Sequence, residues 1–486
     1  MGQAEIPSLS FRLPHGYTFE SEFVLPELVA DSVILGQTSA DASPSAIFLG
    51  KLAEFERMRT SVWLDAVGAH AIYVMGKRRS GKTFTLGVIA EGLAAPGWIR
   101  QGAATQGVLV LDTLNVYGTM PFPVAEVHGP DSDEMKELRR WHLPETPPPV
   151  ALFRPRGTPG PPGLDSTEIA VRPADISAEE WCNLFGADAY ADPMGHLVTE
   201  VHEKVTRQGY TDRGGTAHPA IDDHGIDDLL ACLEDDPAID RYELRTKEAV
   251  RRRFGAMSRL SIFSQAGTDL RDLIRAGEIS VLLLRDIEQG LRSLLIGIIV
   301  KKIMELRSYS DRFERMASVH AARAAITGSA EDSRTAHEYE ERAKEGLPRC
   351  WVLIDEAHNY IPSRESVPSR PHLRKYINEG RNLGLSIVVA TQNPSGLDPA
   401  IQRNADILIC HSMSMRDDIS AAEGMLNTLV PDSVLKDGTD RITGRTFEYL
   451  IRGLPQGYAI VSTDQAERVF PIRVRPRITL HGGREY

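Results

Sequence analysis

One glycine-rich segment has the residue types and spacing of a phosphate-binding loop. The segment GKRRSGKT (76–83) matches the pattern GxxxxGK[ST], follows the apolar run 71–75 and opens an amphipathic stretch. In such a loop, backbone N–H groups surround a phosphate at a helix N-terminus, whereas an ordinary glycine turn binds nothing. We expect Lys82 to reach the β- and γ-oxygens of a nucleotide and Thr83 to offer its hydroxyl to Mg²⁺. The expected nucleotide-binding residues are Gly76, Lys77, Arg78, Arg79, Ser80, Gly81, Lys82, Thr83 and Phe84.

Two adjacent acids end a later apolar run, WVLIDE (351–356). Ligands of open α/β sheets bind at the carboxyl ends of the strands, so this is where catalytic acids are expected. Asp355 would hold Mg²⁺, and Glu356 would polarise the attacking water. Successive strand residues point to opposite faces, so Glu356 must turn off the strand end for both acids to face one nucleotide. The alternative is a pair of solvated acids at the end of a strand.

Two further polar residues could complete such a site. Gln392 ends the apolar run 385–391 and could bridge the attacking water and the γ-phosphate. Arg381 lies in the turn EGRNLG (379–384) and could reach the site of a neighbouring subunit. The alternatives are an ordinary surface glutamine and an arginine that caps a helix C-terminus.

The elements that must position these residues are predicted by continuous apolar runs. Such runs indicate strands that are covered on both faces, as in a parallel α/β sheet. The region between the second and third runs is different, because it begins with the proline-rich stretch 142–163, which predicts a linker or surface loop. A capping-box pattern, Ser177 to Glu180, then starts a helical region. The predicted strands are 71–75, 107–112, 278–284, 350–355, 385–391 and 405–410.

These patterns divide the chain into seven parts. The core is expected in three pieces, separated by a large insertion and a smaller polar excursion. In order they are an N-terminal arm or abbreviated β-barrel (1–60), the first part of the core (61–120), a mostly helical insertion (121–265), a core strand and helix (266–306), a polar helical excursion (307–346), the second part of the core (347–470) and a C-terminal tail (471–486).

The charge balance confines where nucleic acid could bind. The 486 residues include 55 Lys and Arg against 67 Asp and Glu, a net charge of −12, so DNA could contact only a local basic patch. The best candidate lies in the insertion, where the alternative is a solvated helix whose arginines pair with acids such as Glu248. The candidate DNA-binding residues are Lys247, Arg251, Arg252 and Arg253, with Arg245 and Arg259 nearby.

The remaining composition predicts a cytoplasmic protein. Its four cysteines, Cys182, Cys232, Cys350 and Cys410, form no CxxC pair and no zinc-ligand spacing, so reduced thiols are expected. The start of the sequence lacks the features of a secretory signal or a myristoylation site. The longest apolar run, 294–300, is far too short to span a membrane.

The ordered set of motifs resembles the HerA branch of the HerA/FtsK superfamily of RecA-like ATPases, which are hexameric DNA-translocating motors. The resemblance runs from about residue 45 to the end, and its most specific parts are the EGRNxG…TQxPxxLD block and the closing tail. The segments that carry it are GKRRSGKT (76–83), VLVLDTLNVY (108–117), FRPRG (153–157), GEISVLLLRDI (277–287), WVLIDEAHNYIP (351–362), EGRNLGLSIVVATQNPSGLD (379–398) and FPIRVRPRITLHGG (470–483).

The resemblance implies a RecA-like P-loop core with a mainly parallel sheet, ATP and Mg²⁺ as cofactors, a homohexamer, and double-stranded DNA as a partner. It implies that Lys82 and Thr83 are nucleotide and metal ligands, Asp355 and Glu356 the Walker B pair, Gln392 the sensor and Arg381 the intersubunit arginine. A nuclease or a sirtuin-like effector is the implied protein partner. The implied function is a DNA translocase or helicase that hydrolyses ATP at subunit interfaces.

The sequence departs from the family pattern at several places that bear on the site. The phosphate-binding loop contains Arg78 and Arg79 where Thr and Gly are more usual. Asp112 matches an acidic residue of the family, but the Gly-Glu that usually follows is missing. His70 stands beside Ala69 where the family often carries an arginine just ahead of the P-loop strand.

Three other functions are compatible with parts of the sequence. A hexameric ATPase scaffold of the antiphage-defence type could regulate an effector without translocating along DNA. The tetrad DEAH (355–358) also occurs in RNA helicases, but its distance of 273 positions from Lys82 argues against that class, and leaves His358 as a supporting or interface residue. A secretion-coupling ATPase is disfavoured because the sequence has no membrane segment.

Overall fold

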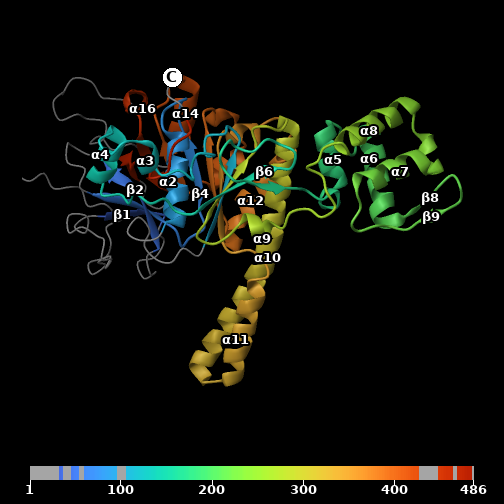
Figure 1. Cartoon of the computed structure of the whole chain (residues 1–486), viewed down its shortest axis with the longest axis horizontal. Coiled ribbons are helices and arrows are strands. Elements are labelled where there is room, and N and C mark those ends of the chain that lie inside the picture. The colour runs from blue at the N-terminus through green and yellow to red at the C-terminus, as the bar shows by residue number, and fades with distance from the viewer. Residues whose placement is uncertain are drawn as a thin grey trace, which may run out of the picture.

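A long, strongly twisted sheet organises the protein, whose computed structural model describes residues 32–36, 45–53, 60–95, 106–425, 447–463 and 468–483. A helical lobe lies beyond one end of the sheet, and a helical hairpin projects from one face (Figure 1). In the described residues the sheet has 13 strands in the order β1-β3-β2-β15-β14-β13-β4-β12-β11-β5-β10-β6-β7. Its mainly parallel part, covered by helices on both faces, confirms the α/β fold expected from the sequence.

The strands are short and mostly buried. Their bounds are β1 (Ser32–Leu35), β2 (Ala46–Leu52), β3 (Ser61–Asp65), β4 (Ala71–Met75), β5 (Gly107–Asp112), β6 (Val150–Pro155), β7 (Thr167–Ile169), β10 (Ile279–Leu283), β11 (Cys350–Ile354), β12 (Ser386–Thr391), β13 (Ile407–Cys410), β14 (Tyr458–Thr463) and β15 (Arg468–Val474), with a separate hairpin of β8 (Tyr210–Thr211) and β9 (Ala217–His218).

The helices range from single turns to one very long helix. Their bounds are α2 (Lys82–Ala94), α3 (Val124–Val127), α4 (Asp133–Arg140), α5 (Ala178–Phe185), α6 (Pro193–Glu203), α7 (Ile226–Asp235), α8 (Leu244–Met257), α9 (Leu270–Leu273), α10 (Gln289–Thr327), α11 (Ala330–Ala343), α12 (Arg370–Glu379), α13 (Pro399–Asn404), α14 (Arg416–Met425) and α16 (Phe447–Gly453). No helix of the described segments combines the length and apolar character needed to cross a membrane.

Strand β4 lies in the middle of the sheet and leads into the phosphate-binding loop. It pairs in parallel with β12 on one side and β13 on the other, and β11 follows β12. Alternate residues of β4 pack on opposite faces: Ile72 and Val74 belong to the core beneath α2, and Tyr73 and Met75 to the core beneath α10 and α12. All six strands predicted from apolar runs are present, within two residues of the expected bounds.

The other half of the sheet joins the two ends of the described chain. Strands β14 and β15 are antiparallel, and β15 pairs with β2, which pairs with β3. The carboxylate of Glu91 in α2 is fully buried and accepts hydrogen bonds from Arg475 (2.8 Å) and from the backbone of Thr479 (3.0 Å).

The arm or barrel expected over residues 1–60 lies largely outside the described residues, and its described strands β1 and β2 extend the sheet.

The proline-rich stretch 142–163 differs from its prediction as a linker or loop. Its middle forms β6, which pairs in parallel with β10 and extends the sheet by one strand. Prolines flank this strand, and Pro155 is its last residue, so the strand's interior hydrogen bonding survives.

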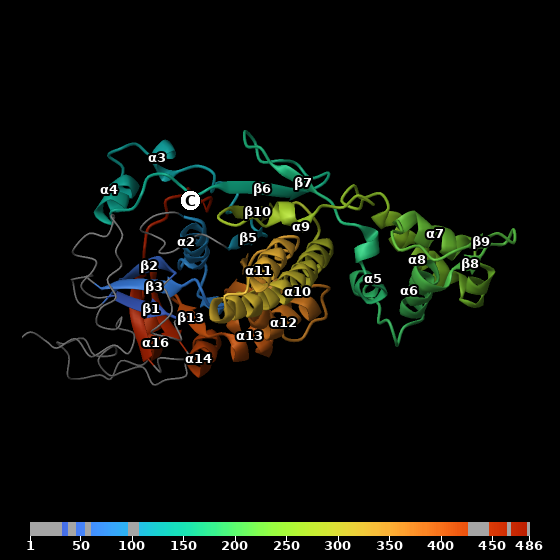
Figure 2. The same cartoon turned by 90° about the horizontal axis from the view of Figure 1, so that it is seen from below.

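The chain leaves the sheet twice to form helical projections. Helices α5 to α8 build a lobe around Trp181, Phe185 and Phe254, beyond the β7 end of the sheet (Figure 2). The first half of α10 is buried against the sheet, and its second half packs against α11 as an antiparallel hairpin that projects from the core (Figure 1). The lobe falls within the region predicted as an insertion, and the hairpin within the predicted polar excursion.

Candidate nucleotide site

The phosphate-binding loop connects β4 to α2 and requires glycine at two places. Gly81 has φ = 120°, and a Cβ on Gly76 would lie 2.5 Å from the Ser80 hydroxyl oxygen. Arg79 has φ = 63°, which is uncommon for a residue with a side chain. The loop thus has the tight backbone that leaves N–H groups at the start of α2 available for an anion.

Lys82, the first residue of α2, is almost completely buried beneath this loop. Its Nζ donates a hydrogen bond to the carbonyl oxygen of Lys77 at 3.1 Å. Burial lowers the pKa of Lys82, and the carboxylates of Asp355 and Glu356 act in the opposite direction. A cation this poorly solvated is well suited to bind phosphate oxygens, because an anionic ligand would restore the stabilisation that it lacks.

A residue that the sequence analysis did not single out supports the loop from below. His411 follows β13; its Nε2 lies 2.9 Å from Thr85 Oγ1, and its Nδ1 lies 2.9 Å from the Tyr458 carbonyl oxygen. Burial lowers the pKa of His411 to about 4, so the ring is neutral and Nδ1 donates to the carbonyl while Nε2 accepts from the hydroxyl. The next carbonyl, of Ser412, accepts from the Lys77 backbone N–H at 2.8 Å.

The hydroxyl and the carboxylate expected to ligate a metal lie together. Thr83 Oγ1 donates to Asp355 Oδ2 at 2.5 Å, and Asp355 is buried at the end of β11. Tyr117 donates to the carbonyl oxygen of Thr83 at 3.2 Å and fixes the first turn of α2. This oxygen pair beside a phosphate-binding loop fits the ligand preference of Mg²⁺, which binds through few protein oxygens together with substrate phosphates.

The backbone turns away from the direction of β11 at Glu356, as the sequence analysis expects. It adopts φ = 49°, and Gln392 Nε2 donates to its Oε1. Its Oε2 is buried with no hydrogen-bond partner in the described part of the chain, and lies 3.5 Å from His358 Nδ1. His358 Nδ1 also lies 3.0 Å from Thr391 Oγ1. One carboxylate oxygen is therefore held by Gln392, and the other lies beside His358 without a hydrogen bond.

The Asp112 carboxylate stabilises the turn that follows β5. Its carboxylate accepts backbone N–H groups of Leu114 (3.2 Å), Val116 (3.1 Å) and Tyr117 (2.8 Å), which closes the turn after β5. Burial raises the pKa of Asp112, and these N–H groups oppose that effect. Both oxygens are used in shaping the turn that carries Tyr117.

The C-terminal tail contacts the start of α2. The guanidinium of Arg477 lies 6.0 Å from the ring centroid of Phe84, and the His481 ring lies 5.8 Å from the same ring. Arg477 crosses α2 at Gly87, where a Cβ would lie 2.6 Å from its guanidinium carbon. The tail thus packs against Phe84, the last residue of the expected nucleotide-binding set.

Arg381 lies near the amino end of β4, whereas the phosphate-binding loop follows its carboxyl end. Its NH2 donates to Asp406 Oδ1 at 3.0 Å and to the Asn404 carbonyl oxygen at 3.1 Å, at the end of α13. The same Asp406 oxygen accepts the backbone N–H of Ala71, the first residue of β4. The loop begins after the other end of that strand, about 16 Å away at 3.3 Å per residue. Arg381 and the phosphate-binding loop of one chain are therefore not brought together.

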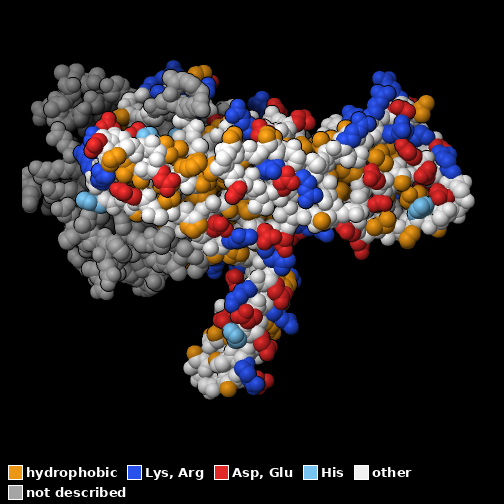
Figure 3. All heavy atoms as spheres, viewed as in Figure 1, with side chains coloured by type: hydrophobic (Ala, Val, Ile, Leu, Met, Phe, Trp, Pro, Cys, Tyr) orange, Lys and Arg blue, Asp and Glu red, His pale blue; other side chains and the backbone are white. Residues whose placement is uncertain are grey.

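The candidate DNA-binding residues lie on α8 in the lobe. Lys247 pairs with Asp240 at 2.8 Å, Arg251 pairs with Glu234 at 2.7 Å, and the Arg252 guanidinium lies 3.5 Å from Glu248. Arg253 donates to a backbone carbonyl of its own helix. Figure 3 shows Lys and Arg side chains at the upper edge of the lobe, with acidic side chains next to them.

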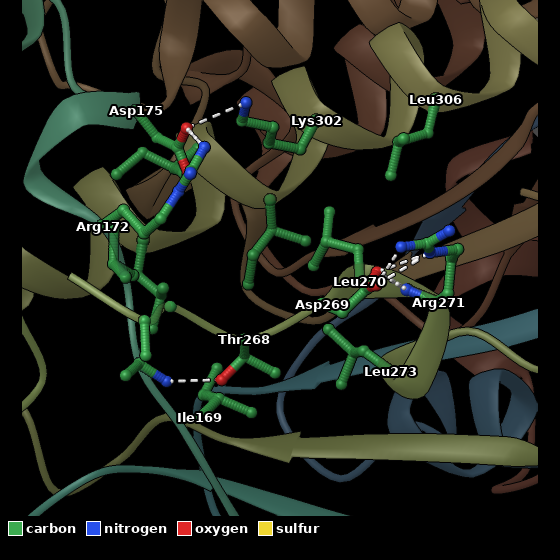
Figure 4. Close-up of a pocket in the computed structure, with 17 residues that line it drawn as sticks. Ile169, Arg172, Asp175, Thr268, Asp269, Leu270, Arg271, Leu273, Lys302 and Leu306 are labelled. Carbon is green, nitrogen blue, oxygen red and sulfur yellow. Dashed lines mark hydrogen bonds and ion pairs between the residues drawn. The ribbon is translucent and has the colours of Figure 1, made fainter. Parts of the chain in front are cut away.

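A cavity lies away from these residues, at the neck between the lobe and the core. Its volume is about 350 Å³, and its apolar wall is formed by α9 and α10 (Figure 4). Asp175 pairs with Arg172 (2.8 Å) and Lys302 (2.9 Å) on one side, and Asp269 pairs with Arg271 on the other. None of the site residues expected from the sequence lines it. It is therefore a feature of the neck and not of the nucleotide site.

The phosphate-binding loop follows β4 and opens α2, and the acidic pair follows β11, which is two strands from β4 in the sheet. Together these features define a P-loop ATPase. The profile of the family described as "Helicase HerA, central domain" matches residues 47–303. The chain belongs to this family and is a HerA-type ATPase.

Solved structures give further comparisons. VirB4 of Thermoanaerobacter pseudethanolicus is 13% identical, with a TM-score of 0.47 over 88% of this chain and 96% of VirB4. The plasmid coupling protein TrwB in complex with the non-hydrolysable GTP analogue GDPNP is 13% identical, with a TM-score of 0.45 over 93% of this chain and 98% of TrwB. None of the curated proteins compared with the sequence matches it.

Proposed function

We propose that the protein is a homohexameric, Mg²⁺-dependent motor that uses ATP hydrolysis to move along double-stranded DNA. Membership of the HerA helicase family supports a DNA-directed motor. The observation that carries the proposal is the assembly of Thr83 with Asp355, and of Glu356 with Gln392, at one edge of adjacent strands.

Each of these residues has a distinct role in the proposed reaction. The loop 76–84 and Lys82 bind the phosphates, and Thr83 and Asp355 would hold Mg²⁺, which neutralises charge on the phosphate oxygens. Glu356 accepts a proton from the attacking water through the oxygen that Gln392 does not occupy. Gln392 directly follows β12, the strand between the loop strand β4 and the acidic strand β11, so its amide can respond to the γ-phosphate and to Glu356 together.

The hexamer is proposed from the position of Arg381. This arginine is too far from its own loop to act on its own nucleotide, but its side chain is 42% exposed and can meet the nucleotide of a neighbour. An arginine supplied in this way contributes about 10³–10⁵ to the rate of related enzymes.

Mixing two inactive variants tests the shared site. Arg381→Ala should lower turnover by about 10³–10⁵-fold, to a small residual rate, with nearly unchanged ATP affinity, and Lys82→Ala should abolish binding. Mixed oligomers should regain activity, because some interfaces combine an intact loop with an intact arginine. Absence of rescue at every ratio would contradict the assignment of Arg381.

The motor function is tested by ATP turnover with and without duplex DNA, with Glu356→Gln as the blank. Strong stimulation that disappears between low and moderate salt would support a motor that binds several phosphates. Steady turnover that does not respond to DNA would contradict translocation. It would favour instead an ATPase scaffold that regulates a nuclease or a sirtuin-like effector.

A further inference from the structure

His70 directly precedes β4 and lies between two carboxylates, at the same end of this strand as Arg381. Its Nε2 lies 3.0 Å from Asp65 Oδ2, at the end of β3, and its Nδ1 lies 2.7 Å from Asp406 Oδ2, just before β13. Ionised carboxylates only accept hydrogen bonds, so both ring nitrogens must donate and the ring must be an imidazolium. Burial alone would lower the pKa of His70, but the two carboxylates outweigh it and raise the pKa to about 9.

The ring has almost no freedom to move. A Cβ added to Gly36 would lie 2.6 Å from its Cε1, and a Cβ on Gly68 would lie 3.1 Å from its Nε2. The Trp351 ring packs against it with centroids 5.9 Å apart, and only 3% of the residue is exposed. A fixed positive charge is thus built into the fold at this point.

That charge is connected to Arg381 through a single carboxylate. Asp406 contacts His70 through Oδ2 and Arg381 through Oδ1, at 2.7 and 3.0 Å. Burial would raise the pKa of Asp406, but His70 and Arg381 lower it, so this carboxylate stays ionised. The charges alternate in sign along the contacts from Asp65 through His70 and Asp406 to Arg381, and the two positive charges balance the two negative ones.

We propose that His70 is a positioning residue for Arg381, acting through Asp406, and that it fixes the geometry in which this arginine is presented to a neighbouring subunit. The inference rests on the proposed function of Arg381. Without the imidazolium, the two buried carboxylates would be left with one cation, and Arg381 would be drawn toward them and away from the surface. A small displacement of a catalytic group is enough to slow a reaction strongly.

The test is His70→Gln in the full chain, which removes the charge and keeps hydrogen-bonding groups. We expect kcat for ATP to fall roughly 10²-fold while the affinity for ATP changes little. In an Arg381→Ala background, His70→Gln should cause no further loss. Mixing with Lys82→Ala should restore turnover, because the defect lies in what the variant presents to its neighbour. His224→Gln, at a buried histidine of the lobe, is the matched control for loss of a buried ring.

The possible results distinguish failure of the shared site from failure of the role of His70. If Arg381→Ala hydrolyses ATP normally, the shared site fails. If Arg381→Ala is inactive but His70→Gln is normal, or if the two losses multiply, only the role of His70 fails. Should His70→Gln not fold, the pH dependence of turnover by the wild type and by Arg381→Ala provides the test, because both proteins keep the His70 ring.

A pH profile gives an independent readout. The charged groups facing His70 are Asp65 and Asp406, with Arg381 beyond, and the ring loses its positive charge as the pH rises through about 9. Turnover should therefore fall as pH rises through about 9, and this loss should be missing from the residual activity of Arg381→Ala. A loss of turnover at high pH that is caused by Lys82 would appear in both the wild type and Arg381→Ala. The same loss at high pH in both proteins would overturn the proposal.

Discussion

Thr83 Oγ1 and Asp355 Oδ2 lie 2.5 Å apart, although 272 positions separate the two residues in the sequence. The contact exists because β4 and β11 lie on either side of β12, and because α2 begins immediately after the loop. The same arrangement places Gln392, at the end of the intervening strand, against Glu356. Four of the residues predicted to act on nucleotide are thereby gathered at one edge of the sheet.

Glu356→Gln should bind ATP but lose turnover. The amide keeps the size of the side chain and removes its capacity to accept a proton, and general-base catalysis contributes about 10²–10⁴-fold. Nucleotide binding is measured by titration and hydrolysis by phosphate release. Glu365→Gln, at an exposed position of the following loop, is the control and should hydrolyse normally. A Glu356→Gln protein with near wild-type hydrolysis would remove Glu356 from the mechanism.

His411→Ala should weaken ATP binding, because the loop loses the ring that connects Thr85 to the Tyr458 carbonyl. We expect roughly a tenfold rise in Kd, which corresponds to about 1.4 kcal/mol, the usual size of one or two hydrogen bonds. Ser412→Ala is the matched control, since the carbonyl that accepts from Lys77 belongs to its backbone and survives. Equal affinities in the two variants would show that His411 does not support the loop.

Glu180→Gln should destabilise the protein in a pH-dependent way. Glu180 is buried in α5; it accepts a hydrogen bond from Lys301 (3.1 Å), and its Oε1 lies 2.8 Å from His372 Nε2, so these contacts join the lobe to α10 and α12. Burial would raise its pKa, but these partners lower the pKa to about 2 from an ordinary 4.5. Removing one partner of a buried pair costs about 3 kcal/mol.

The sign of this effect follows from the lowered pKa. The stability that ionised Glu180 contributes is complete above about pH 4.5 and is lost as the pH falls toward 2. Melting temperatures of the wild type and Glu180→Gln should therefore differ by a constant amount at neutral pH and converge in acid. A difference that persists unchanged to low pH would contradict the ionic role of Glu180.

The basic residues of α8 should contribute unequally to DNA binding. Lys247 and Arg251 are neutralised by Asp240 and Glu234, whereas Arg252 is 82% exposed with Glu248 at 3.5 Å, and Arg253 donates to a carbonyl of its own helix. Replacing Arg252 and Arg253 by alanine should reduce the slope of log K against log salt by about two. Replacing Lys247 and Arg251 should leave it nearly unchanged. Equal slopes for both double variants would argue against DNA contact through α8.

Much of the core could be predicted because it depends on local patterns. Buried parallel strands have continuous apolar runs, and the P-loop and the acidic pair each lie within a few residues. The turn of Glu356 out of its strand also follows from strand geometry alone, and its φ of 49° confirms it.

The remainder depends on contacts between distant segments. His411 supports the loop only because β13 lies beside β4, and nothing in its own neighbourhood indicates that pairing. Strand β6 was missed because its flanking prolines resemble those of a loop. The carboxylates that pair with Lys247 and Arg251 come from other elements of the lobe, so the composition of α8 could not identify them.

The position of β4 also bears on how the protein is made. Its two neighbours, β12 and β13, are encoded about three hundred residues later, since His70 already bonds to Ser386, 316 positions away. At about 5–20 residues per second, a ribosome needs roughly 15–60 s to complete this stretch. During that time the nascent chain carries an apolar strand with neither partner available. The strand therefore stays unpaired while about three hundred residues are added, and Asp355, Glu356 and Gln392 join the loop only late in synthesis.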